Sequence, residues 1–204
     1  MKNQKTLLIL VFVLVLLIGG AYALYQSLAD QVDTNQLSTQ PPATTIPETT
    51  GMGPAETTSA QAETISPAPD FTVYDPDGNP VNLSDFRGKP VIVNFWASTC
   101  GYCVKEMPDF EQAYQAYGDQ IHFLMVNITD GSWDTLDTAK SFMAGTNYTF
   151  PVYFDTDQDA AAVFGIYSLP MTFFFDSTGY GVAYARGALD AATLQKGIDM
   201  LLPQ

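Results

Sequence analysis

Residues 91–103 read VIVNFWASTCGYC, a run of six residues, apolar apart from Asn94, that leads, after three small residues, into two cysteines separated by two positions. The run carries β-branched and aromatic side chains at odd and even positions alike, which is typical of a strand covered on both faces in the middle of a sheet. Apolar residues then recur every three or four positions from Gly101 to Tyr117, which predicts a helix that Pro108 should kink. The cysteines therefore lie where a central strand gives way to a helix.

The rest of the C-terminal sequence alternates β-branched or aromatic runs with helical stretches and turn residues, which indicates one α/β domain. We expect further strands at 71–74, 81–83, 121–128, 151–154, 171–176 and 181–186, the last two forming a hairpin. We expect helices from Ser132 to Met143, from a cap at Thr156 to Phe164, and from a cap at Asp190 to Leu201.

The N-terminal 25 residues are almost wholly apolar after Lys2 and Lys5. The 19 residues from Leu7 to Tyr25 would form a helix of about 28 Å, close to the thickness of a bilayer core. Both lysines precede the run, so the positive-inside rule predicts a single-pass signal anchor at 1–25 with the rest of the chain outside the cytoplasm. A cleavable signal ending near Ala21-Tyr22-Ala23 is the alternative.

Residues 26–69 are rich in Thr, Pro, Ser and Glu and show no apolar periodicity. Such a composition cannot offset the entropy of ordering the backbone, so we expect a disordered linker with a reach on the order of 40 Å. The folded domain is then expected at 70–204.

The chain is strongly acidic, with a formal net charge of −14 at pH 7. Without Lys2 and Lys5, six basic residues remain against 22 acidic ones, so the exported part carries −16. A field of this sign repels nucleic acid and anionic lipid headgroups, and it favours solubility. We expect a monomer that binds no nucleic acid and requires no cofactor.

Cys100 and Cys103 have the spacing of a redox pair on a first helical turn. The helix N-terminus favours a thiolate on Cys100, the expected nucleophile, while Cys103, one turn deeper, is the expected resolving thiol. The alternative is a purely structural disulfide, but a bridge across four residues removes little loop entropy from the unfolded chain and therefore stabilises the fold little. A zinc site needs four ligands, and the chain offers two Cys and His122 alone, so we assign no metal.

The segment from Val91 to Pro108 resembles the active-site segment of membrane-anchored, thioredoxin-like proteins of the TlpA/ResA type. The similarity continues through Phe150-Pro151-Val152, Phe164-Gly165-Ile166 and residues 169–173, and it covers about 135 residues. The resemblance implies a thioredoxin fold: a central mixed sheet flanked by helices, with an extra N-terminal strand or hairpin.

The resemblance also implies roles for individual residues. Pro170 matches the cis-proline that faces the disulfide, and Leu169 would supply the backbone groups that pair with a substrate chain. Glu106 matches an acidic residue near the resolving Cys. Burial would raise the pKa of this residue and let it exchange a proton with Cys103. Trp96 and Tyr102 are expected beside the disulfide, among the substrate-binding residues.

The function implied is an extracytoplasmic thiol-disulfide oxidoreductase that reduces disulfides in exported proteins, with apocytochrome c or a methionine sulfoxide reductase as candidate substrates. A CcdA-like or DsbD-like membrane protein would supply its electrons. Thr99 departs from the family, which usually has Trp there, and Thr-Cys-Gly-Tyr-Cys resembles disulfide isomerases, so an oxidase or isomerase stays open. A copper-binding metallochaperone is a further alternative, since two thiolates can bind Cu(I).

Overall fold

The computed structural model describes residues 37–39 and 67–202, and the expected anchor at 1–25 lies outside these ranges. Within the described ranges, no helix is both long and apolar enough to cross a bilayer. Most of the expected linker also lies outside the described residues.

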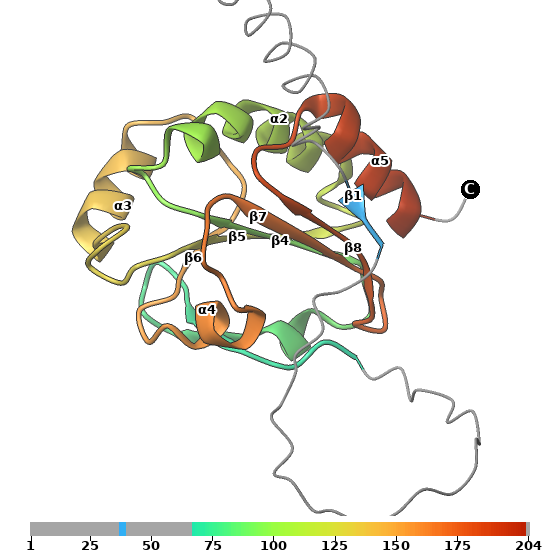
Figure 1. The fold of residues 1–204 in the computed structure, drawn as a ribbon, viewed down its shortest axis with the longest axis horizontal. Helices are drawn as coiled ribbons and strands as arrows, with labels where there is room; N and C mark the ends of the chain where they lie inside the picture. The colour runs from blue at the N-terminus through green and yellow to red at the C-terminus, as the bar shows by residue number, and fades with distance from the viewer. Residues whose placement is uncertain (1–36, 40–66, 203–204) are drawn as a thin grey trace, which may run out of the picture. The chain divides into compact units, whose positions relative to one another are not determined.

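The described strands form one mixed sheet, whose order is β1-β8-β7-β4-β5-β6-β2-β3 (Figure 1). The central strand β4 (Val91–Trp96) runs parallel to β5 (His122–Asn127) and antiparallel to β7 (Met171–Phe175). The remaining strands are β1 (Leu37–Ser38), β2 (Thr72–Tyr74), β3 (Pro80–Asn82), β6 (Val152–Phe154) and β8 (Gly181–Arg186). This arrangement is the thioredoxin-like fold, and the antiparallel pair of β2 and β3 is the expected N-terminal hairpin.

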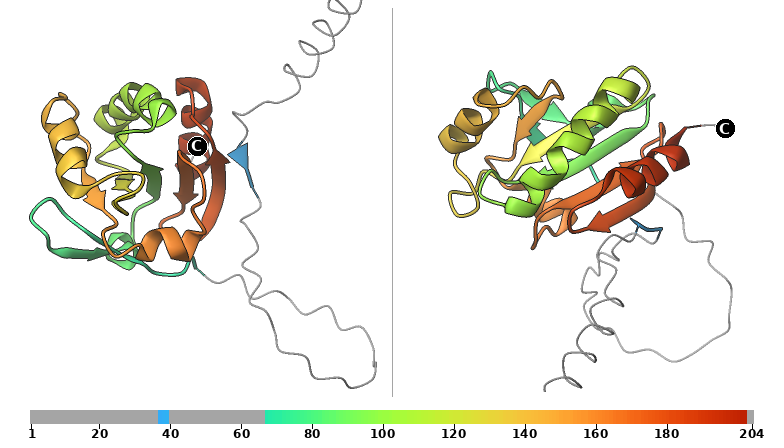
Figure 2. Two further views of the ribbon diagram at one scale, coloured as in Figure 1. Left: turned by 60° about the vertical axis from the view of Figure 1, so that its left-hand side comes forward. Right: turned by 90° about the horizontal axis from the view of Figure 1, so that it is seen from above.

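Helices cover both faces of the sheet (Figure 2). One face packs against α2 (Gly101–Tyr117), α3 (Leu136–Ala144) and α5 (Ala191–Leu201), and the other against α4 (Asp159–Phe164) and the short 3-10 helix η1 (Leu83–Phe86). Each face therefore has its own apolar core. The α2 core contains Cys103, and the partly buried Cys100 packs against it.

Strand β4 is buried along its whole length, as its sequence predicts for a central strand. Its side chains alternate between the two cores: Ile92 and Trp96 pack on the α2 side, while Val93 and Phe95 pack on the α4 side. This period of two places Asn94 on the α2 side as well. A polar amide thus lies in an otherwise apolar layer under the first turns of α2.

Three expectations about local structure are wrong. Helix α3 begins at Leu136 rather than at Ser132, because residues 130–135 form a turn in which Asp130 Oδ1 accepts hydrogen bonds from the backbone N–H groups of Ser132 and Trp133. Thr135 then provides the N-cap of the helix.

Helix α4 is capped at Gln158 rather than at Thr156. The carboxylate of Asp155 accepts hydrogen bonds from the N–H groups of Ala160 and Ala161, so the side chain that caps α4 comes from the residue after β6.

In the expected linker, Leu37–Ser38 forms a two-residue strand paired with β8, and Leu37 packs against the α2 core. Hydrogen bonding along the sheet edge and this apolar contact order a segment whose composition predicts disorder.

Candidate redox site

Cys100 and Cys103 form a disulfide across the first turn of α2, with 5.3 Å between their Cα atoms. Cys100 is the N-cap residue, and its Sγ accepts a hydrogen bond of 3.3 Å from the backbone N–H of Cys103. Cys103 is fully buried, whereas Cys100 is only partly covered. Only Cys100 can therefore meet a partner's sulfur, which agrees with its expected role as nucleophile.

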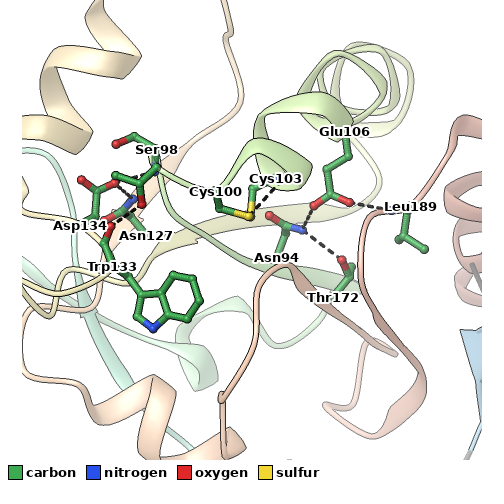
Figure 3. The surroundings of a disulfide bond; sticks show 11 residues. Asn94, Ser98, Cys100, Cys103, Glu106, Asn127, Trp133, Asp134, Thr172 and Leu189 are labelled. Atoms are coloured by element: carbon green, nitrogen blue, oxygen red, sulfur yellow. Dashed lines mark hydrogen bonds between the residues drawn. A yellow bond between two sulfur atoms is a disulfide. The ribbon is translucent and has the colours of Figure 1, made fainter. Parts of the chain in front are cut away.

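Glu106 lies one turn after Cys103 and is buried, with 2% of its surface exposed. Its Oε1 accepts a hydrogen bond of 2.8 Å from Asn94 Nδ2, and its Oε2 accepts one of 2.7 Å from the backbone N–H of Leu189 (Figure 3). Burial raises the pKa of Glu106 to about 8; the two hydrogen bonds oppose this rise, and the charge of Asp109 adds to it. Near neutral pH the carboxyl can therefore both give and take a proton.

The Leu169–Pro170 peptide bond is cis, as the resemblance predicts. Met171 pairs with Phe95 across the antiparallel β4–β7 ladder. Pro170 therefore lies beside the C-terminal end of β4, from which the chain continues to Cys100. Leu169 is partly buried and packs against the same core as Cys100. The fold thus brings Leu169 and Pro170 to the redox pair, and substrate binding by them stays a prediction.

Trp96 is fully buried, and its ring packs 5.8 Å from that of Phe142 on α3. It therefore packs in the core directly before residues 97–100, which we call the redox loop, and offers no surface to a substrate, which corrects its place among the substrate-binding residues. Tyr102, between the cysteines, is 69% exposed and keeps that expected place.

A loop that the sequence analysis missed holds the redox loop from the side of α3 (Figure 3). The buried carboxylate of Asp134 accepts hydrogen bonds of 2.6 Å from the N–H of Ser98 and 3.0 Å from Asn127 Nδ2. The hydroxyl of Thr99 donates a bond of 2.6 Å to the carbonyl of Trp133. Residues 133–134 thus fix the two residues that precede Cys100.

The pKa of Asp134 is lowered even though burial alone would raise it, because hydrogen bonds from Thr138, Ser98 and Asn127 favour the carboxylate. No residue spacing in the sequence predicts this contact, since Asp134 and Ser98 are 36 positions apart. The only local signal is the turn composition of Asp130-Gly131-Ser132.

The same loop presents Trp133, which is 42% exposed. Tyr167, three residues before Pro170, is 66% exposed, and the Arg186 guanidinium lies 5.4 Å from the centre of its ring. Together with Tyr102, between the two cysteines, these residues make three exposed aromatic side chains near the redox pair in the chain or through a hydrogen bond: Tyr167 precedes the cis-proline, and the carbonyl of Trp133 accepts the hydroxyl of Thr99. We refer to them as the aromatic rim. Among the described residues, no group of three or more His, Cys, Asp or Glu side chains could hold a metal ion.

Comparison with known proteins places this geometry in context. The profile of the AhpC/TSA family matches residues 65–182. The thiol-disulfide oxidoreductase ResA of Geobacillus thermodenitrificans is 30% identical over 139 residues, which are 68% of this chain and 78% of the relative. ResA of Bacillus subtilis is 29% identical over 139 residues, 68% of this chain and 75% of the relative.

Solved structures agree with these relatives. A thiol:disulfide interchange protein of the thioredoxin family from Chlorobium tepidum superposes with a TM-score of 0.59 at 26% identity, covering 68% of this chain and 97% of that one. The exposed lipoprotein thioredoxin Etrx1 of Streptococcus pneumoniae superposes with a TM-score of 0.57 at 28% identity, covering 64% of this chain and 99% of that one.

Proposed function

Because the chain belongs to the AhpC/TSA family and is a thiol-disulfide oxidoreductase related to ResA, we propose that it reduces disulfides in exported proteins at the outer face of the cell membrane. The observation that carries this proposal is the asymmetry of the redox pair. A partly exposed Cys100 is bonded to a fully buried Cys103, one helical turn from a carboxyl with a pKa of about 8.

In the proposed reaction, the Cys100 thiolate attacks a substrate disulfide and forms a mixed disulfide, releasing one substrate thiolate. Glu106 takes the proton of Cys103, whose thiolate then attacks the Sγ of Cys100. The mixed disulfide breaks, the second substrate thiolate leaves, and the Cys100–Cys103 disulfide remains. Two electrons pass from the enzyme dithiol to the substrate in each cycle.

A membrane protein of CcdA-like or DsbD-like type would return these two electrons by attacking Cys100 with its own dithiol. The proposed location rests on the apolar, lysine-flanked N-terminus at 1–25, and the name of the pneumococcal relative, an exposed lipoprotein, supports a place outside the cytoplasm. Apocytochrome c and an exported methionine sulfoxide reductase are the substrates proposed for testing.

Thr99 favours a second candidate, a disulfide oxidase or isomerase, because Thr-Cys-Gly-Tyr-Cys resembles the segment of periplasmic isomerases. The reduction potential of the Cys100–Cys103 couple separates the two functions, and it can be measured by equilibrating the protein with glutathione or dithiothreitol buffers. A potential near or below about −230 mV supports the reductase, whereas one above about −180 mV supports the oxidase or isomerase.

A further inference from the structure

The side-chain amide of Asn94 forms hydrogen bonds through its nitrogen but none through its oxygen. Nδ2 donates to Glu106 Oε1 at 2.8 Å and to Thr172 Oγ1 at 3.0 Å. Oδ1 is buried and accepts no hydrogen bond from any residue that the structure describes. A buried acceptor without a donor is costly, so its presence requires an explanation.

The position of this oxygen suggests what would bind it. Asn94 lies on the α2 side of β4, in the same layer as Trp96 and Cys103. In Figure 3 the amide nitrogen points to Glu106 and Thr172, while the oxygen is turned to the side of the disulfide. The unbonded acceptor therefore faces the redox pair rather than the carboxyl.

The oxidation state explains why the oxygen has no donor. In a disulfide neither sulfur carries a proton, so neither can donate to an amide oxygen. Reduction places an S–H group on the fully buried Cys103, and that thiol then requires an acceptor. We propose that Asn94 Oδ1 accepts a hydrogen bond from the Cys103 thiol in the reduced protein, an inference that rests on the proposed dithiol chemistry.

The step balances as follows. A thiolate of the donor dithiol attacks the Sγ of Cys100 and forms a mixed disulfide with it, while the Cys100–Cys103 bond breaks and Cys103 leaves with the electron pair. The donor's second thiolate later attacks the donor sulfur of that mixed disulfide and releases the Cys100 thiolate. The Cys103 thiolate takes the proton of the Glu106 carboxyl, which becomes a carboxylate. Cys103 S–H then donates to Asn94 Oδ1, while Asn94 Nδ2 donates to the Glu106 carboxylate.

The Asn94 amide thus forms a hydrogen bond with each product of the proton transfer. Its oxygen accepts from the Cys103 thiol, and its nitrogen donates to the Glu106 carboxylate. It stabilises a neutral Cys103 thiol together with a charged Glu106, and so keeps Cys103 protonated until Cys100 has formed a mixed disulfide. Asn94 is in this sense a positioning residue that acts through Cys103 and Glu106.

The S–H stretching band in the infrared spectrum of the full-length protein tests the inference. The Cys100→Ser variant retains the Cys103 thiol alone and cannot re-form the disulfide, so its band reports one group. Adding Asn94→Leu should shift this band to higher frequency, because a hydrogen bond to oxygen weakens the S–H bond. Thr172→Val is the matched control: it removes another partner of Asn94 but leaves Oδ1 in place, and the band should not shift. An unshifted band in the Asn94→Leu protein would overturn the inference.

A second measurement needs no change at Asn94. The side-chain carbonyl ¹³C resonance of Asn94 in the wild-type, full-length protein should move downfield when dithiothreitol reduces the disulfide, whereas equal shifts in both states would refute the new hydrogen bond. The first experiment requires only the free Cys103 thiol, and the second only a disulfide that dithiothreitol can reduce. Their failure would leave the proposed reductase function standing, and an oxidase-like potential would leave this inference standing.

Discussion

Replacing Glu106 with Gln should remove a large part of the pH dependence of folding stability. Glu106 has its pKa raised from 4.5 to about 8 in the folded protein, chiefly by burial. A raised folded-state pKa means that the stabilisation is fully present below the unfolded value of 4.5 and is lost as the pH rises through about 8. The slope is about 1.4 kcal/mol per pH unit, and the total is about 5 kcal/mol.

Other groups titrate in both proteins and cancel in the comparison. The pKa of His122 is lowered by burial, so this residue acts with the opposite sign just below its ordinary value of 6.5. Burial raises the pKa of Asp155, which adds to the fall in stability with pH. The difference between wild type and Glu106→Gln therefore isolates the contribution of Glu106.

Urea unfolding of the oxidised, full-length protein at intervals from pH 5 to pH 8 measures this difference. The free energy of unfolding of the Glu106→Gln protein should gain on that of wild type by about 1.4 kcal/mol for each unit that the pH rises between 4.5 and about 8. Glu111→Gln is the control on the same helix. The pKa of Glu111 is lowered, because its hydrogen bonds from Thr149, Gln115 and Phe150 outweigh burial, so its curve should run parallel to that of wild type. If the Glu106→Gln curve is also parallel, the burial argument fails.

Three further predictions follow from the site. Cys100→Ser should abolish disulfide exchange, whereas Cys103→Ser should accumulate mixed disulfides identifiable by mass spectrometry in the native host; an absence of trapped partners would count against the reductase. Asp134→Ala should lower the free energy of unfolding by about 1–3 kcal/mol, because buried donors lose their acceptor, and a variant as stable as wild type in urea would contradict the role of the loop. Trp133→Ala, in the aromatic rim, should lower kcat/KM with a protein substrate about fivefold, a loss of about 1 kcal/mol, if the rim contacts the substrate. Met200→Ala, exposed on α5, is the surface control, and equal kcat/KM values for the two variants would show that Trp133 does not contact the substrate.

Much of the fold could be predicted from the sequence because its signals are local. Five apolar residues among the six of Val91–Trp96 suffice to indicate a strand buried on both faces, and the spacing of apolar residues predicts helix α2 with its observed bounds. Asp190 caps α5 as expected, since its carboxylate accepts the N–H of Thr193 three residues on. The boundaries of α3 and α4 were missed, because side chains in the preceding loops, such as Asp130 and Asp155, accept the N–H groups that decide how those segments turn.

The sequence by itself determined the two cysteines, their unequal depth on a helical turn and the carboxyl three residues on, because all of these lie within one segment of regular geometry. Only the tertiary structure decided how the site is tuned. Leu189, 83 positions from Glu106, provides one of its hydrogen bonds, and Asp134 reaches Ser98 across 36 positions. The raised pKa of Glu106 and the unbonded oxygen of Asn94 arise from exclusion of water between packed elements, and the spacing of residues along one chain segment does not encode that exclusion.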